Sequence, residues 1–501
     1  MNLRTTSGRS WQAIQTAWPA GAPGYALLAL VLVGVALRLI AIVSWWPVAT
    51  TLDDGYERFA GSPFENVLHP AGYSLILGAL GAATRDVAVP VLLQHLGGFV
   101  SALLLWGATR RITGSAWAGL LPAGIVLLSP DQIILEHAIM SETWGILLTS
   151  IGLYAAVRSF DEPQPWWRWP LVTGVALGAA VTIRTAGLLV IPVAVLALLL
   201  CRPSPFGSWR RWAAPVSAAA GAAAVLVVFA TANAAFGQGF GIRSSPGWYL
   251  YGRAAQFADC NQFTPPAGTE VLCESTPASE RHGAARYWGL AFRSGSGAPG
   301  PRYFGPFGNH DQLLGEWAQR AILAQPGDYL GSVWEYAQGY WYPGSRPSRP
   351  NSGTGLDPQL AFTDTQLALV EGAVKRMLER YYDSFAVHKY QPGLEFLHGW
   401  QQVIRFGPLL LSITTLLTLV GFAAGTRRSR IGLLLFGLGG LALIVPPALT
   451  ANYAGRYMVP MAGPMMAAAA IAIVELWRGP IGRTWTAARD RRGASAAGAG
   501  A

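Results

Sequence analysis

The chain has 501 residues, of which 52% are hydrophobic and only 12% are charged, with a formal net charge of +10. Soluble domains carry about 25% charged residues, so this composition excludes an ordinary soluble protein. The positive charge is nearly all arginine, and the arginines lie between long apolar runs, where they orient membrane spans. This placement excludes nucleic acid as the expected partner. The sequence predicts a polytopic α-helical protein of the cell membrane.

Residues 1–24 precede an apolar run that is too long for the core of a cleaved signal peptide. We expect a cytoplasmic N-terminus followed by a retained first span. Apolar, charge-poor runs of sufficient length predict about ten spans. These runs are 25–46, 87–109, 114–130, 138–157, 169–183, 185–201, 212–231, 406–426, 431–453 and 457–474, with 169–183 and 185–201 forming a tight helical hairpin.

The apolar segment 71–83 is too short for an ordinary span and is typical of an interfacial helix. If it does not cross, every basic loop falls in the cytoplasm, as the positive-inside rule requires. If it crosses, Arg110 and every later basic cluster move outside. The sequence therefore favours a surface helix at this position.

This topology divides the chain into a membrane module at 25–231, which includes a first outer loop at 47–86, and an extracytoplasmic domain at 232–405. Membrane helices at 406–477 and a cytoplasmic basic tail at 478–501 follow. We expect the outer domain to be α/β or mixed. Its cysteines, Cys260 and Cys273, lie in a polar stretch in an oxidising compartment, which favours a disulfide.

The first outer loop contains Asp53, Asp54 and Tyr56 shortly after the first span. Adjacent carboxylates repel, which raises the pKa of one of them and suits it to act as a general base. Their oxygens also suit a divalent cation. The structural alternative is a solvated acidic turn that caps a short helix.

Ionisable residues occur at two further places in the apolar part of the chain. His69 opens the interfacial helix, either to contact an anion or only to begin the helix. Glu136, His137 and Glu142 lie at the start of the fourth span; on one continuous helix the two glutamates would be about 120° apart. An ionisable residue inside a span is a functional candidate, and Glu142 is the stronger one. The structural alternative is an ion pair with Arg38 or Arg184.

Two arginines do not fall in the predicted cytoplasmic loops, where most arginines of this chain lie. Arg184 lies at the outer turn of the predicted hairpin, and Arg456, followed by Tyr457, lies at the outer mouth of the last span. Guanidinium groups bind phosphate through two parallel hydrogen bonds. A lipid headgroup is the anion expected at this depth, either as a specific substrate or as bulk phospholipid.

The order of these features resembles the GT-C membrane glycosyltransferases. The shared features are an acidic pair after span one, a His-Pro-x-Gly-Tyr helix, Ser-Glu in span four, an outer Arg, and Arg-Tyr before a proline-containing last span. The resemblance is to the polyprenyl-phosphate-sugar-dependent type, such as protein O-mannosyltransferases and aminoarabinose transferases. It covers residues 25–200 and 430–475. The outer domain before the last three spans departs from the commonest arrangement, in which the soluble part follows the last span.

The resemblance implies transfer of a sugar from a polyprenyl-phosphate donor to an acceptor hydroxyl on the outer face. Asp53, or Asp54 as the second candidate, would be the base. Arg184 and Arg456, together with His69, would hold the donor phosphate. Direct displacement would invert the anomeric centre. No cofactor is required, although a divalent cation is compatible with the loop.

The acceptor is expected to be a glycan, a glycolipid or a protein. The Arg-, Ala- and Gly-rich composition is typical of a GC-rich genome and favours mannose or arabinose in a cell-envelope role. Two other classes remain open. A lipid flippase would use Glu142 and Arg38 as its path. A membrane acyltransferase or ligase of envelope glycans would depend on an essential histidine.

Overall fold

Helices make up most of the computed structural model, which describes residues 21–49, 60–161, 166–202, 205, 207–243, 245–289, 298–342, 375–451 and 453–479. The first group is α2 (Ala22–Ser44), α3 (Gly72–Ala83), α4 (Ala88–Thr113), α5 (Ala116–Leu128), α6 (Pro130–His137), α7 (Glu142–Asp161), α8 (Arg168–Ile183), α9 (Val190–Cys201) and α10 (Trp209–Ala235), with the 3-10 turns η1 (Pro63–Glu65) and η2 (Thr185–Leu189). The second group is α11 (Pro246–Ala254), α12 (Ala284–Tyr287), α13 (Pro299–Phe304), α14 (Asp311–Ala324) and α15 (Pro326–Trp341), with η3 (Glu270–Leu272) and η4 (Ala278–Glu280).

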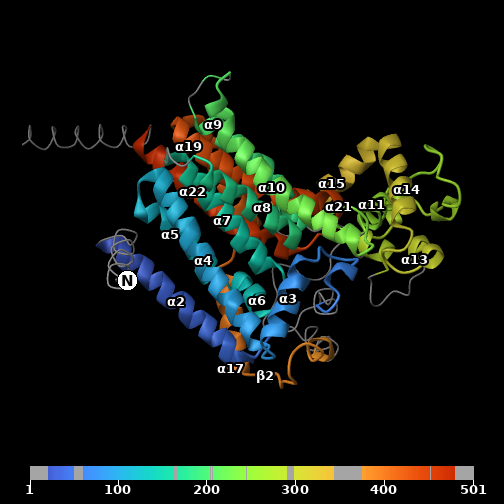
Figure 1. The fold of residues 1–501 in the computed structure, drawn as a ribbon, viewed down its shortest axis with the longest axis horizontal. Helices are drawn as coiled ribbons and strands as arrows, with labels where there is room; N and C mark the ends of the chain where they lie inside the picture. Colours follow the sequence, from blue (N-terminus) through green and yellow to red (C-terminus); the bar gives the residue numbers. More distant parts are fainter. Residues whose placement is uncertain are drawn as a thin grey trace, which may run out of the picture.

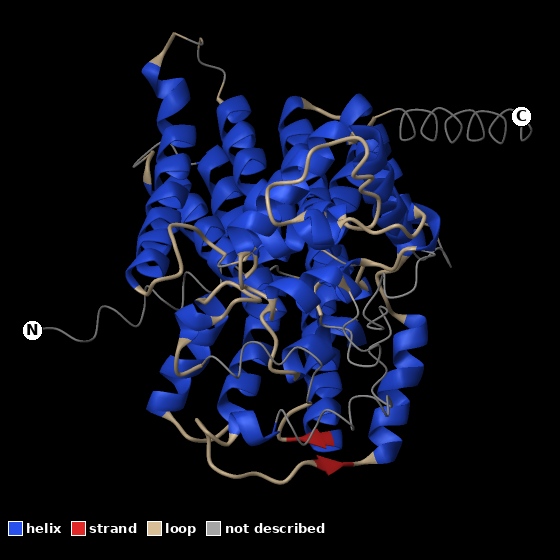
Figure 2. Cartoon of the chain, turned by 90° about the vertical axis from the view of Figure 1, so that its right-hand side faces the viewer, coloured by secondary structure: helices blue, strands red, loops and turns tan. Residues whose placement is uncertain are grey.

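The C-terminal part completes the helical bundle. Its helices are α17 (Gln391–Val403), α18 (Pro408–Ala424), α19 (Arg427–Leu433), α20 (Gly439–Ala442), α21 (Val445–Thr450) and α22 (Val459–Arg478), with a π-helical turn η5 (Leu434–Leu438) and the 3-10 turn η6 (Gly455–Met458). Two short strands, β1 (Trp45–Trp46) and β2 (His388–Lys389), pair antiparallel. Figure 2 shows this strand pair at one end of the bundle.

Six helical stretches of the described chain are long and apolar enough to span a membrane, which confirms a multi-pass membrane protein. They are Ala22–Ser44, Ala88–Thr113, Trp209–Ala235, Gln391–Ala424, Arg427–Thr450 and Gly455–Arg478. The other predicted spans correspond to α5, α7, α8 and α9. Of these, α5 continues into α6 across a 51° bend, and α8 and α9 are short. The predicted count of ten therefore remains a prediction.

The central helices pack side by side, with α2 at one edge (Figure 1). Small residues allow the closest approach. A Cβ added to Gly174 of α8 would clash with the carbonyl oxygen of Ala218 on α10. Close backbone contact through small residues is how helices associate in a membrane, where hydrophobic burial provides little attraction between them.

The arginines predicted to be cytoplasmic gather at one end of this bundle. Asp161, at the end of α7, lies 2.7 Å from Arg428 and 3.5 Å from Arg111. Arg478, at the end of α22, donates to the Thr113 carbonyl oxygen at 2.7 Å. We call this the arginine-rich end. Residues that are far apart in the sequence but were all predicted to face the cytoplasm thus lie together.

Helix α3 does not cross the bundle, since the chain enters and leaves its region at the same end. The Trp45 carbonyl, just after α2, lies 2.6 Å from the His137 ring. Gln94, in the second turn of α4, donates to the carbonyl oxygens of Glu136 and Ala138 at 2.8 and 2.7 Å. The end of α2 and the start of α4 therefore contact the same short segment, as the arginine distribution predicts.

The described part of the predicted outer domain between residues 245 and 342 is helical rather than α/β or mixed. Proline begins α11, α13 and α15, where its missing N–H and fixed φ favour a helix start. Trp248, Tyr251 and Trp317 are buried in its core. Cys260 and Cys273 form the predicted disulfide, with their Cα atoms 5.9 Å apart. In Figure 1, α11, α13 and α14 lie together at one end of the molecule; we call α11–α15 the outer layer.

Helix α17 lies within the predicted domain limits of 232–405 but packs on the membrane helices α2 and α6. The Trp400 indole donates to the Leu128 carbonyl oxygen at 2.9 Å, and Gln401 donates to Asp131. A Cβ added to Gly393 would clash with Ser44 at the end of α2. The described end of this segment therefore belongs to the bundle.

Candidate functional site

Three interruptions of helical structure bring charged residues together at the end of the bundle opposite the arginine-rich end. Glu142 is the first residue of α7, and Arg184 is in extended conformation directly after α8. Arg456 lies in η6, just before Pro460 in the first turn of α22. Charged side chains at chain breaks can turn toward one another without facing lipid.

Glu142 is the centre of this cluster, and its side chain is fully buried. Its Oε1 atom lies 2.7 Å from Nη1 of Arg184 and 3.5 Å from Nε of Arg456. Arg184 Nη1 also donates to Ser141 Oγ at 3.0 Å. The two arginines that the sequence singles out as exceptions therefore meet on one carboxylate. The predicted alternative, an ion pair between Glu142 and Arg184, is present.

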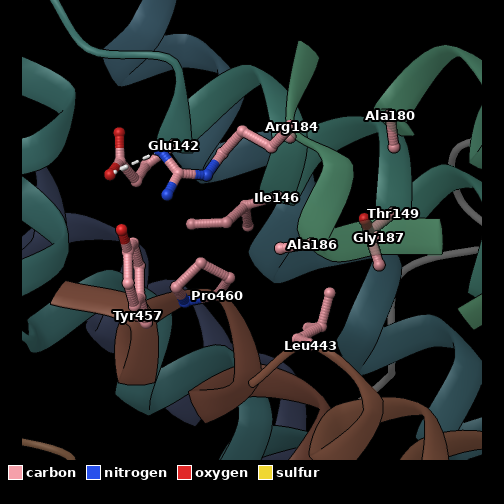
Figure 3. Close-up of a pocket in the computed structure, with 11 residues that line it drawn as sticks. Glu142, Ile146, Thr149, Ala180, Arg184, Ala186, Gly187, Leu443, Tyr457 and Pro460 are labelled. Atoms are coloured by element: carbon pink, nitrogen blue, oxygen red, sulfur yellow. Dashed lines mark ion pairs between the residues drawn. The ribbon is translucent and has the colours of Figure 1, made fainter. Parts of the chain in front are cut away.

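Tyr457 lies beside both guanidinium groups. Their central carbons are 5.5 Å (Arg184) and 5.7 Å (Arg456) from the centroid of its ring. An aromatic face attracts a cation at such distances and limits its movement. Figure 3 shows the Arg184 side chain reaching toward Glu142, with Tyr457 on the same side of the pocket.

A small pocket adjoins these charges. Apart from the charged pair and Tyr457, its walls carry apolar and small side chains from α7, α8, η2, the turn after α20, and α22. These wall residues are Gly145, Ile146, Thr149, Ala180, Ala186, Gly187, Leu443 and Pro460. The pocket thus has the Glu142–Arg184 ion pair at one end and apolar walls elsewhere. Arg456 contacts the same carboxylate and makes this charged cluster cationic, which suits a lipid with an anionic head.

A second buried cluster lies between α2, α4 and α6. Arg38 donates two hydrogen bonds of 2.8 Å to the carboxylate of Glu136. His95 Nδ1 lies 2.9 Å from the same carboxylate, and His95 Nε2 lies 3.1 Å from His137 Nδ1. His137 Nε2 in turn lies 2.6 Å from the Trp45 carbonyl oxygen. The predicted ion pair with Arg38 is therefore made by Glu136 rather than Glu142.

Glu136 and Glu142 do not lie on one continuous helix, so the angle of about 120° expected for that case does not apply. Glu136 ends α6 and Glu142 begins α7, with a break at residues 138–141. Gln94 compensates this break because its side chain donates to two backbone carbonyls there. The interruption directs the two glutamates into different clusters.

The remaining sequence-predicted residues lie elsewhere. Asp53, Asp54 and Tyr56 fall outside the described residues. His69 is half-buried, its backbone N–H bonds to Asn66 Oδ1 at 2.9 Å, and it does not line the pocket. Sequence reasoning missed His95, although two adjacent polar residues in the apolar run 87–109, Gln94 and His95, were a usable signal.

Within the described ranges no group of three or more His, Cys, Asp or Glu side chains is placed to hold a metal ion. The charged side chains around Glu142 would instead suit an anion, since two of the three are cations.

Residues 90–234 match the family model of the dolichyl-phosphate-mannose-protein mannosyltransferases. The predicted resemblance is confirmed over this part of the chain, which includes Glu136, Glu142 and Arg184. No curated protein matches the chain in sequence.

Solved structures of two membrane enzymes are also matched. The Archaeoglobus fulgidus oligosaccharyltransferase in the apo form has 12% identity and a TM-score of 0.43, covering 91% of this chain and 51% of that one. The same enzyme, AglB, with an inhibitory peptide and a dolichol-phosphate has 12% identity and a TM-score of 0.36, covering 91% and 50%. ArnT from Cupriavidus metallidurans bound to undecaprenyl phosphate has 14% identity and a TM-score of 0.33, covering 91% and 79%. The chain spans about half the length of the archaeal enzyme.

Proposed function

We propose that this protein is an integral membrane glycosyltransferase that transfers a sugar from a polyprenyl-phosphate donor to an acceptor hydroxyl on the outer face. The observation that carries the proposal is the pair of guanidinium groups on Glu142: Arg184 lines the charged end of an apolar-walled pocket, and Arg456 contacts the same carboxylate. The match of residues 90–234 to a mannosyltransferase family supports it. Of the two sugars that the sequence favours, mannose and arabinose, the family description favours mannose.

The charges suit such a donor. Arg184 and Arg456 together with Glu142 have a net charge of +1, and a lipid-phosphate-sugar is a phosphodiester with one negative charge. When the bond between sugar and phosphate breaks, the phosphate becomes a monoester and gains negative charge. Fixed guanidinium groups stabilise charge that develops on a leaving group, so these residues would favour the departure of polyprenyl phosphate.

The acceptor hydroxyl needs a base, and we assign this role to Asp53, with Asp54 as the second candidate. The described residues on either side of this segment support the assignment. Ala49 donates its backbone N–H to the His137 carbonyl oxygen at 3.1 Å. Ala60 is buried in a cluster with Ile139 and Ile183, the neighbour of Arg184. Attack opposite the phosphate would invert the anomeric centre.

Lipid binding tests the proposal. The purified protein is titrated with polyprenyl phosphate and binding is followed by native mass spectrometry, for the wild type and for Arg184→Gln and Arg456→Gln. Each substitution is expected to weaken binding about tenfold or more, because charge-assisted hydrogen bonds to phosphate are lost. Arg85→Gln is the matched control, since Arg85 forms an exposed ion pair with Asp383. Equal affinity in all four proteins would contradict the assigned site.

Catalysis is tested separately with a polyprenyl-phosphate-linked mannose or arabinose and envelope glycans, glycolipids or peptides as acceptors. Acceptor-dependent release of polyprenyl phosphate is the expected result. A flippase would move the lipid across proteoliposomes without releasing the sugar, which would overturn the enzyme assignment. The structure gives the flippase reading little support, because Arg38 and Glu142 belong to two separate ion pairs.

A further inference from the structure

The segment that leads to Arg456 is held from outside the bundle. Residues 448–451 and 453–456, here called the support segment, begin in the last turn of α21 and carry Arg456 at their end. Most of the contacts described below come from α11 and α15 of the outer layer. The position of one donor-site arginine therefore depends on a part of the chain that lines none of the pocket.

Arg253, on α11, makes the central contact. It is fully buried, and its Nη2 donates to the carbonyl oxygens of Ala448 and Ala451. Its guanidinium carbon lies 3.8 Å from the centroid of the Tyr336 ring on α15. Burying an arginine is costly, so a site that keeps one with backbone carbonyls as acceptors must hold those carbonyls in place.

Tyrosines of α15 hold the rest of the support segment. Tyr329 donates its hydroxyl to the Leu449 carbonyl oxygen at 3.2 Å. The Tyr340 hydroxyl lies 3.4 Å from both the N–H and the carbonyl oxygen of Ala454, two residues before Arg456. The Tyr340 and Tyr453 rings lie 4.8 Å apart. These contacts hold the backbone up to the start of η6, from which Arg456 projects.

We infer that Arg253 is a positioning residue for the donor site, through which the outer layer sets where Arg456 lies and therefore how tightly the site binds a lipid phosphate. The inference rests on the proposed function for its ligand. A guanidinium displaced by about 1 Å loses much of its bidentate geometry with phosphate, so small movements of the support segment alter affinity. The outer layer thus has a part in donor binding without touching the donor.

Hydrogen exchange tests the positioning step. Arg253→Met removes the two hydrogen bonds and keeps much of the side-chain volume. Arg281→Met is the matched control, because Arg281 is also buried and donates to the Ala255 and Ala258 carbonyl oxygens within the outer layer itself. Amide exchange in peptides covering 448–456 is expected to rise roughly tenfold or more in Arg253→Met, as for loss of a charged donor, and to stay unchanged in Arg281→Met.

Polyprenyl phosphate binding by the same full-length proteins tests the consequence. The dissociation constant, and the KM for the sugar donor, are expected to rise more in Arg253→Met than in Arg281→Met, with a smaller change in kcat. Arg253→Lys should recover part of the affinity because one donor remains. If Arg253→Met does not fold, Tyr340→Phe, which removes a single hydroxyl, should give the same pattern at smaller amplitude.

Two results overturn the inference. The first is that amide exchange at 448–456 is unchanged in Arg253→Met. The second is that exchange is faster in Arg253→Met but its affinity for polyprenyl phosphate equals that of Arg281→Met. Failure of the proposed function looks different. In that case the wild type does not bind polyprenyl phosphate, or Arg456→Gln leaves its binding intact. If the wild type binds and Arg456→Gln weakens binding while the Arg253 variants do not, only the positioning role fails.

Discussion

At the scale of single residues, Glu142 has two effects on its arginines: it holds them in place and it reduces their net charge. Its Oε1 atom contacts both guanidinium groups while its side chain is fully buried. Removing one partner of a buried ion pair leaves the other partner uncompensated and destabilises a protein by about 3–5 kcal/mol. The arginines here retain some exposure, so a smaller loss is expected.

Glu142→Gln should therefore bind the doubly charged product more tightly and turn over more slowly. With the carboxylate neutralised the three side chains carry +2, which we expect to tighten polyprenyl phosphate binding about tenfold and slow its release. Titration calorimetry and single-turnover kinetics measure the two effects. Glu136→Gln is the control, since Glu136 pairs with Arg38 in the second cluster. Equal affinity in Glu142→Gln and Glu136→Gln would contradict this role.

The base assignment is tested at Asp53 and Asp54. Asp53→Asn should abolish sugar transfer, by a factor of about 10² or more, because the amide cannot accept the acceptor's proton. Polyprenyl phosphate binding and thermal stability should stay unchanged, since both are measured without the acceptor. Full transfer activity in both Asp53→Asn and Asp54→Asn would eliminate the base assignment.

The sequence singled out two arginines of the candidate site, but not most of their contacts. Arg184 and Arg456 were identifiable because arginine outside the cytoplasmic loops is unusual. An ion pair of Glu142 with Arg184 was one predicted alternative, but the contact of Arg456 with the same carboxylate was not predicted, because it depends on how η6 packs against the start of α7. The chain of contacts from Glu136 through His95 and His137 to Trp45 was missed for the same reason.

At the scale of helices, apolar run length located the membrane helices because each run must cover a fixed hydrocarbon thickness. It could not locate the break at residues 138–141, because these residues were counted as the beginning of the predicted span 138–157. The break depends on Gln94 and on the parallel bridge between Ala49 and Ala138, both contributed by other segments. The sequence of residues 138–141 alone therefore does not predict the break.

The apolar walls between α7, α8 and η2 predict selectivity for the lipid chain. Ala186→Phe places a ring in the pocket wall, where Ala186 now leaves space. Affinity for a long polyprenyl phosphate should fall about tenfold, because the phenyl ring would overlap with the prenyl chain of the lipid. Affinity for a short prenyl phosphate should stay near the wild-type value, because the arginines are unchanged.

Val227→Phe is the control for this experiment, since Val227 on α10 is 53% exposed and away from the pocket. It should bind both lipids like the wild type. A parallel loss for long and short chains in Ala186→Phe would mean that the ring disturbs the charged end, and would contradict a chain-binding role for these walls.

At the scale of the whole molecule, the sequence predicted the sides of the loops without predicting how they pack. The positive-inside rule grouped Arg111, Arg428 and Arg478, and the structure brings these residues together at one end through Asp161 and Thr113. The outer layer was predicted as a separate domain, but its contacts with the support segment were not. These contacts depend on two buried polar groups, Arg253 and Tyr340, whose partners lie far away in the sequence.

The orientation of the molecule can be measured with two matched cysteines. Gly207, between α9 and α10, and Gly327, in α15, both lie where an added side chain meets no atom within 4 Å. In a Cys201→Ser background, which removes the free thiol, a membrane-impermeant maleimide should label Gly327→Cys in intact cells. Gly207→Cys, near the arginine-rich end, should react only after permeabilisation, because α10 separates the two positions across the bilayer. Labelling of both in intact cells would mean that α10 does not cross. Labelling of Gly207→Cys alone would invert the molecule and place Arg184 and Arg456 in the cytoplasm, where an outer-face transfer is impossible.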